Sequence, residues 1–221
     1  PEAGKIRILE PSEGSGMFWG TMPESMFNRA EMHGIDMDPA SSRVAKHLYP
    51  SARHLNIPFQ ESPYPEGFFD LAITNVPFNK NPVQDPNANF GELSLHNYFF
   101  AKTAGRLREG GVVAFITTHF TMDASSPAQR IAISNQGLKF LGAVRLNQDA
   151  FGNVANTKVV TDIIIMQKVD PAKIDKSSGF DNNGFNRGAQ TILIPNPQPG
   201  EPNARAELNL HPYFTTKASE K

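Results

Sequence analysis

Short apolar runs alternate with segments of helical periodicity over most of the chain. The first run, Ile6 to Leu9, ends at Glu10-Pro11 and a glycine-rich turn, which is typical of a buried parallel strand that leads into a helix. A second run, His33 to Asp38, is followed by a helical pattern with Asp38 at the N-cap and Pro39 at the first helical position. The start of the chain therefore predicts a β-α-β-α order.

The same alternation continues through the middle of the chain. Further strands are expected over residues 53–57, 69–74, 112–118, 141–146 and 159–167, and helices over residues 94–107 and 129–136. Roughly seven strands separated by helices predict an α/β fold with a mostly parallel, doubly wound sheet and helices on both faces. The last two strands are expected to be antiparallel, because no helix-length segment clearly divides them.

The pattern weakens in the last quarter of the chain. Residues 170–188 are rich in Asp, Asn, Gly, Ser and Lys and predict a long mobile insertion. Residues 191–194 are compatible with one more short strand, and residues 195–202 hold four prolines, which favours an extended connector. We therefore expect a catalytic domain over residues 1–168, followed by a flexible insertion and C-terminal extension over residues 169–221.

Composition narrows the functional classes. The 221 residues carry a net charge of -1, so any phosphate contacts must come from a local basic patch. Cysteine is absent, which excludes disulfides, thiolate metal sites and a cysteine nucleophile. The histidines lack metal-ligand spacing and no apolar run is long enough to span a membrane, so we expect a cytoplasmic protein without a metal site. Candidate phosphate contacts, or simply solvated charges, are Arg106, Arg108, Arg130, Lys139 and Arg145.

The segment from Glu10 to Gly16 stands where the first strand is expected to meet a helix. Its glycines let backbone amides approach a ligand, and the carboxyl end of a strand faces the crevice of an open α/β sheet. Glu10 and Glu13 would repel the pyrophosphate of a dinucleotide at this turn. The ammonium and sulfonium groups of S-adenosylmethionine (SAM) are cations, so the acidic turn favours that cofactor, although a plain strand-turn-helix has the same pattern.

Two further positions suit the nucleoside part of such a cofactor. Asp36 ends the second apolar run, where an acidic side chain can accept both hydroxyls of a ribose. Asp38 competes for this role, but its place before Pro39 favours helix capping. Phe59 and Gln60 follow the third strand, where the adenine is expected, although a surface glutamine beside a core phenylalanine explains the pair equally well.

The segment Asn75-Val76-Pro77-Phe78 follows the apolar strand Phe69 to Thr74 and is expected at the same edge of the sheet. An exocyclic amine on a heteroaromatic ring is a poor nucleophile unless acceptors pull on its N–H groups and localise its lone pair. Asn75 Oδ1 and the Val76 carbonyl are candidate acceptors, Pro77 restricts the backbone, and Phe78 offers a stacking face. Asn and Pro also occur in ordinary turns.

Three segments carry a family resemblance: Glu10-Pro11-x-x-Gly14-x-Gly16, Gly34 to Pro39, and Asn75 to Phe78 occur in the order and spacing of N6-adenine DNA methyltransferases. Residues 5–168 also resemble methyltransferase modules of large phage and mobile-element proteins that carry helicase-like domains. The resemblance implies a Rossmann-like SAM-dependent methyltransferase fold and methyl transfer to N6 of a flipped adenine in DNA, as in restriction-modification. The expected cofactor-binding residues are Glu10, Pro11, Gly14, Gly16, Asp36, Met37, Phe59 and Gln60, and the expected catalytic residues are Asn75, Val76, Pro77 and Phe78.

The sequence departs from this family in ways that leave alternatives open. Val76 replaces the usual first proline but keeps the backbone carbonyl. The family carries a segment before the first strand that helps close the SAM pocket, and here we expect that pocket to be incomplete. Flanking helicase-like or target-recognition domains, or a partner, are expected to choose the DNA sequence. RNA guanine and protein glutamine methyltransferases share the motif, and a non-catalytic SAM- or DNA-binding module is a further alternative.

Overall fold

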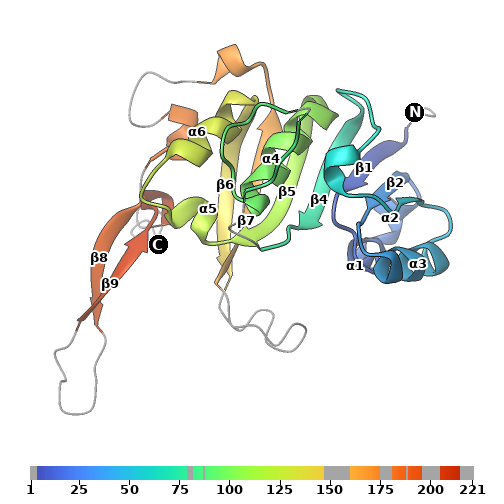
Figure 1. Cartoon of the computed structure of the whole chain (residues 1–221), viewed down its shortest axis with the longest axis horizontal. Helices are drawn as coiled ribbons and strands as arrows, with labels where there is room; N and C mark the ends of the chain where they lie inside the picture. Colours follow the sequence, from blue (N-terminus) through green and yellow to red (C-terminus); the bar gives the residue numbers. More distant parts are fainter. Residues whose placement is uncertain are drawn as a thin grey trace.

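The computed structural model describes residues 4–78, 82–86, 88–146, 160–174, 181–187, 189–195 and 205–214. A seven-stranded sheet with the spatial order β3-β2-β1-β4-β5-β7-β6 forms its centre (Figure 1). Its strands are β1 (Ile6–Glu10), β2 (Ala30–Ile35), β3 (Arg53–Leu55), β4 (Phe69–Asn75), β5 (Leu107–Thr118), β6 (Leu138–Leu146) and β7 (Thr161–Lys168). A separate antiparallel pair, β8 (Gln190–Pro195) and β9 (Arg205–Leu210), projects from the body as a hairpin.

Short and medium helices connect these strands. They are α1 (Met17–Thr21), α2 (Glu24–Phe27), α3 (Pro39–Leu48), α4 (Leu95–Arg106), α5 (Phe120–Asp123) and α6 (Ala128–Asn135), with 3-10 turns η1 (Phe59–Glu61), η2 (Pro171–Lys173) and η3 (Asp181–Gly184). The first five strands pair in parallel, and β7 runs antiparallel between β5 and β6. The predicted α/β class and mostly parallel sheet are therefore confirmed.

Apolar side chains cover both faces of the sheet. Ile8 and Leu9 are adjacent on β1 and both fully buried, yet they belong to different apolar clusters. Because successive strand residues point to opposite faces, these clusters lie on opposite sides of β1. The smaller cluster contains Trp19 of α1, and the larger one contains Phe99 and Phe100 of α4. Helices therefore pack against both faces of the sheet.

Some predicted boundaries were wrong. β2 ends at Ile35, so Asp36 and Met37 lie in the loop beyond the strand, although the Asp36 N–H still donates to the Leu55 carbonyl of β3 at 3.1 Å. β5 starts at Leu107, directly after α4 and before the expected start at residue 112, so Gly110 and Gly111 lie within the strand. Gly110 has a φ of 81°, a left-handed conformation that glycine adopts without strain and that permits an irregular start to the strand.

The expectation of a mobile insertion over residues 170–188 is wrong for residues 181–187. Phe185 is fully buried and stacks on Phe140 of β6, with ring centroids 5.1 Å apart. The side-chain oxygen of Asn182 accepts a hydrogen bond from the Phe140 N–H at 2.8 Å. These contacts supply apolar anchors that local composition did not reveal. Residues 175–180, and residues 196–202 of the connector predicted over residues 195–202, lie outside the described residues.

Candidate functional site

The predicted site residues meet at one edge of the sheet. Strands β1, β2 and β4 are parallel and β1 lies between the other two, so their carboxyl ends stand side by side. Glu10 ends β1, Asp36 follows β2, and Asn75 ends β4. In open α/β sheets this edge is where ligands bind. The hydroxyl of Thr74 donates to the Ser12 carbonyl at 3.3 Å and joins β4 to the turn after β1.

Asp36 connects the glycine turn to the loop after β2. Its two carboxylate oxygens accept hydrogen bonds from the backbone N–H groups of Gly14, at 2.7 Å, and Asp38, at 2.8 Å. Gly14 and Gly16 have φ values of 54° and 82°, so the turn uses the left-handed backbone that glycine permits. Each Asp36 oxygen retains a second lone pair that can accept from a ligand hydroxyl.

Asp38 is the helix cap that the sequence indicated. Its side chain accepts from the Ser41 N–H at 2.8 Å, and Pro39 occupies the first turn of α3. The hydrogen bonds from Ser41 lower the pKa of the Asp38 carboxyl below its usual value. The two acidic residues of this loop thus have separate structural roles: Asp38 starts a helix, whereas Asp36 holds the turn that faces the crevice.

A buried cluster around Glu13 supports the turn from below, and the sequence did not reveal it. The Glu13 carboxylate accepts hydrogen bonds from Trp19 Nε1 at 3.2 Å and contacts His54 Nδ1 at 2.9 Å. Gly34 lies directly beneath it, and a Cβ at this position would stand 1.7 Å from Glu13 Oε2. The glycine of the second motif is therefore needed to make room for a carboxylate of the first motif. Glu13, noted as acidic, and Gly34, part of the second motif, gave a signal in the sequence, whereas Trp19 and His54 did not.

Glu10 is the least satisfied polar group at this edge. Its side chain is 2% exposed, and its Oε2 atom is buried without a hydrogen-bond partner. Burial raises the pKa of Glu10 to about 10, and the nearby carboxylates of Glu13 and Asp36 add to the rise. An unpaired buried carboxyl with acidic neighbours is a site that a cationic group would complete. Pro11, which follows it, is also buried.

The residues predicted near a cofactor adenine separate into exposed and buried ones. Met37 is 72% exposed, so its side chain is available to a ligand. The Phe59 ring is buried against Phe99, with centroids 5.1 Å apart. Phe59 is therefore a core phenylalanine, the alternative that the sequence left open. The Gln60 carbonyl accepts from Lys102 Nζ at 3.1 Å, which fixes the backbone, and its side chain is partly exposed. A contact between Gln60 and adenine stays a prediction.

The segment after β4 places its aromatic ring at the surface. Asn75 is exposed, and the Val76 N–H donates to the Ile116 carbonyl of β5 at 3.0 Å, which holds the backbone beside the next strand. The Val76 side chain is buried in the core. Phe78 is 43% exposed, so it is not a core residue and presents a face that a ring can stack on. Part of the polar loop that follows, residues 79–81 and 87, lies outside the described residues.

Next to this segment, β5 is followed by two aromatic residues, His119 and Phe120, that the sequence analysis did not select as site residues. Phe120 is exposed, and its ring lies 4.1 Å from that of His119. Phe120 also borders a cavity of about 650 Å³ between the start of α4 and helices α5 and α6, whose polar lining includes Gln129. Their position could have revealed them, because the two residues follow β5 in the same way that Val76 to Phe78 follow β4.

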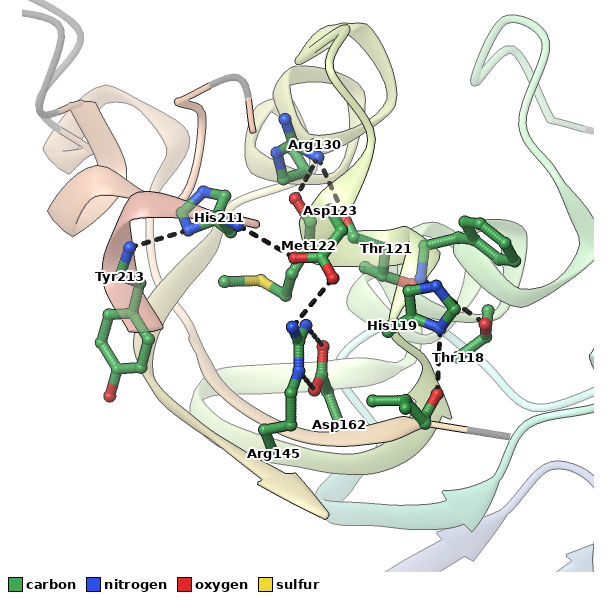
Figure 2. A network of polar contacts seen from close by, with 12 residues as sticks. Thr118, His119, Thr121, Met122, Asp123, Arg130, Arg145, Asp162, His211 and Tyr213 are labelled. Carbon is green, nitrogen blue, oxygen red and sulfur yellow. Dashed lines mark hydrogen bonds and ion pairs between the residues drawn. The ribbon is translucent and has the colours of Figure 1, made fainter. Parts of the chain in front are cut away.

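Buried ion pairs hold the far side of this edge together (Figure 2). Arg145 of β6 donates to both oxygens of Asp162 of β7, at 2.8 and 2.9 Å, and pairs with Asp123 of α5 at 2.8 Å. The other oxygen of Asp123 accepts the His211 N–H at 2.9 Å, so the segment after β9 is tied to the same network. Residues distant in the chain therefore fix the turn after β5.

This network corrects two of the candidate phosphate contacts. Arg130 is 1% exposed and donates to the carbonyls of Thr121, Met122 and Ala124 at 2.9 Å, as Figure 2 shows in part. Arg145 is occupied by its two carboxylates. Both guanidinium groups stabilise the fold, because planar donors suit buried carbonyl and carboxylate partners. They are not placed to bind phosphate.

Within the described ranges of the chain, no group of three or more His, Asp or Glu side chains is arranged to hold a metal ion. None of the helices in these ranges is both long and apolar enough to cross a membrane.

Solved structures share this fold. A proposed class I SAM-dependent methyltransferase from Listeria monocytogenes superposes with a TM-score of 0.61 at 16% identity, over 76% of this chain and 55% of that one. The methyltransferase subunit of a type I restriction-modification system from Streptococcus thermophilus superposes with a TM-score of 0.61 at 17% identity, over 81% of this chain and 45% of that one. A SAM-dependent methyltransferase from Mesorhizobium loti superposes with a TM-score of 0.53 at 14% identity, over 76% of this chain and 93% of that one.

These likenesses establish the architecture. The Rossmann-like fold of SAM-dependent methyltransferases, expected from the motifs, is confirmed. The chain spans 55% and 45% of the lengths of the first two proteins. No model of a known protein family matches the chain. No curated protein is similar to it in sequence.

Proposed function

We propose that this chain is a SAM-dependent methyltransferase domain that methylates the N6 amine of adenine in DNA. One observation carries the proposal: an acidic glycine turn and an Asn-Val-Pro-Phe segment lie at the ends of adjacent parallel strands, β1 and β4. The first suits a cationic cofactor, and the second suits a flat amine. Their side-by-side placement at the ligand edge of this fold supports a reaction between the two.

The cofactor side fits SAM by charge and by hydrogen-bonding capacity. The unpartnered oxygen of Glu10 would pair with the ammonium of the amino-acid moiety, and the turn is open at Gly14, where a Cβ would meet no atom within 4 Å. Asp36 would accept the ribose hydroxyls, and the exposed Met37 would cover the adenine. Bound SAM supplies an electrophilic methyl group on a sulfonium. The descriptions of the Listeria and Mesorhizobium proteins as SAM-dependent methyltransferases agree with this cofactor.

The acceptor side would work by positioning. The Asn75 side-chain oxygen and the Val76 carbonyl would accept the two N–H groups of an aromatic amine and favour a localised lone pair on nitrogen. Phe78 would stack on the ring, which holds the amine at a fixed height above the sheet edge. Fixing two reactants in this way lowers the entropic part of the barrier. A base in duplex DNA must first be flipped out, at a cost of a few kcal/mol.

DNA is the favoured acceptor because of both the motif and the fold. The Asn-Val-Pro-Phe segment is similar to that of the N6-adenine enzymes, and the Streptococcus protein is a restriction-modification methyltransferase subunit. This chain matches less than half of that subunit, so flanking domains or partner subunits would choose the target sequence. The polar loop after Phe78 begins at the acceptor edge and is a candidate substrate contact.

The test is transfer of a radiolabelled methyl group from SAM to DNA, RNA and protein in parallel. We expect label in DNA, recovered as N6-methyladenine after digestion to nucleosides, and its loss in the Asn75→Ala variant. Label in RNA guanine or in protein glutamine would assign a different acceptor to the same site. Binding of S-adenosylhomocysteine without any transfer would leave a cofactor-binding module rather than an enzyme.

A further inference from the structure

The Glu10 carboxyl has no positive partner within the described residues. The charged and titratable groups that face it are the carboxylates of Glu13, on the turn, and Asp36, after β2. His54 of β3 contacts Glu13 at 2.9 Å and the Tyr49 carbonyl at 2.9 Å rather than Glu10. Three carboxyl groups therefore share one edge, and of the two buried ones Glu10 lacks a hydrogen bond at Oε2.

Electrostatics favours the protonated, neutral form of such a carboxyl group. An ionised carboxylate without a partner in a buried site costs several kcal/mol, and like charges nearby add to that cost. Keeping the proton removes both penalties. Glu13 differs from Glu10 because Trp19 and His54 contact its carboxylate oxygens, and these contacts lower the free-energy cost of ionising Glu13.

We propose, on the basis of the proposed function, that Glu10 is a neutral acid in the free protein and releases its proton when the cofactor's amino-acid ammonium binds. The Glu10 O–H bond breaks, the proton passes to solvent, and the resulting carboxylate pairs with the ammonium, which keeps its own protons. No covalent bond forms to the ligand. Cofactor binding is then coupled to pH through a residue of this chain.

The sign of the coupling follows from the two states. Burial raises the pKa of Glu10 to about 10 in the free protein, and an adjacent ammonium lowers the pKa of a carboxyl. The complex thus holds fewer protons, so affinity must rise with pH below that value. For one proton the rise is about tenfold per pH unit from about pH 6 to about pH 7.5, below the range in which a ligand amino group itself titrates.

The test is isothermal titration calorimetry of S-adenosylhomocysteine binding to the full chain at one pH, in buffers of different ionisation enthalpy. The slope of binding enthalpy against buffer enthalpy counts the protons released, and we expect about one. The Glu10→Gln variant keeps the shape of the side chain without an acidic proton, and we expect no release. As a matched control, Glu109→Gln alters an exposed carboxyl that pairs with Lys173, and we expect release to remain near one.

A second probe keeps the test valid if Glu10→Gln does not fold. Methylthioadenosine shares the nucleoside but lacks the amino-acid moiety, so the unaltered protein should bind it without releasing a proton. Infrared difference spectra on adding S-adenosylhomocysteine should show loss of a protonated carboxyl stretch. Binding without proton release, or release that persists in Glu10→Gln, would overturn the inference and leave the proposed function standing. Failure of S-adenosylhomocysteine to bind the folded chain would overturn both.

Discussion

The two halves of the candidate site are built in opposite ways. On the cofactor side, Glu10 and Glu13 are buried, and the side chains of Asp36, after β2, and His54, in β3, hold the turn. On the acceptor side, the side chains of Asn75 and Phe78 are exposed, and the backbone between them is held by the hydrogen bond from the Val76 N–H to β5. The difference lies in how much of each half is complete before a ligand arrives.

Physical chemistry explains the contrast. A buried carboxyl needs a hydrogen-bond partner in place, as Glu13 has, or must keep its proton, as proposed for Glu10, because an unpaired charge away from water is costly. A stacking surface must stay open, since the ring that covers it belongs to the substrate. Substitutions on the cofactor side should therefore change stability and cofactor affinity, whereas those on the acceptor side should change turnover or capture while the fold is unaffected.

The largest effect is expected at Gly34, where the two motifs of the cofactor side touch. Gly34→Ala places a Cβ against the Glu13 carboxylate and forces it away from Trp19 and His54. Overpacking and buried polar groups without partners should together lower the free energy of unfolding by about 2–5 kcal/mol. Urea titration measures this.

Gly105→Ala is the matched control for that change. Gly105 lies in α4, and a Cβ there would meet nothing within 4 Å. The substitution should be neutral or stabilise the helix by up to about 1 kcal/mol. Equal urea midpoints for Gly34→Ala and the unaltered protein would show that the close packing of Gly34 against Glu13 does not stabilise the turn.

Asn75→Ala tests whether the acceptor side acts only in the reaction. Loss of one preorganised polar contact should reduce methyl transfer by roughly 10²-fold or more. The Tm and the affinity for S-adenosylhomocysteine should not change, because Asn75 is exposed and has no role in the turn. Asn28→Ala, an exposed asparagine before β2, should keep full turnover. If Asn75→Ala lowered the Tm and the activity together, the acceptor side would also stabilise the fold, and the contrast with the cofactor side would be wrong.

Phe78 separates capture from turnover. Phe78→Ala should weaken DNA capture by about 1–3 kcal/mol, the usual worth of one stacked base, with a nearly unchanged melting curve. Phe78→Tyr and Phe78→Trp keep an aromatic plane and should retain substantial activity. Fluorescence anisotropy with single-stranded DNA follows the binding, and a lowered Tm for Phe78→Ala would instead indicate that its buried portion stabilises the fold.

The smallest effects are expected in the loop after β2. Asp36→Ala should reduce affinity for S-adenosylhomocysteine by about tenfold or more, the effect of a lost charge-assisted hydrogen bond. Asp38→Ala should leave affinity nearly unchanged and lower the Tm by about 2–4 °C, the size expected for one helix cap. Calorimetry and thermal melts on the two variants distinguish these roles, and the reverse pattern would exchange them.

Local signals in the sequence predicted much of the fold and the outline of the site. Asp38 and Pro39 placed the start of α3, and the apolar run before Asn75 placed β4 and the segment after it. Each signal acts within a few residues, through caps, fixed backbone angles or strand periodicity. Phe185 was missed because a single aromatic residue in a polar stretch has no periodic pattern, although it is buried against β6.

The sequence by itself determined the strand and helix order, the acidic glycine turn, and the Asn-Val-Pro-Phe segment, because each depends on neighbours along the chain. Only the tertiary structure decided that Glu13 lies over Gly34 and contacts His54, a residue 41 positions away. Such contacts depend on which strands become adjacent. Burial is likewise a property of the folded chain, and it is burial among other carboxylates that gives Glu10 its altered proton affinity.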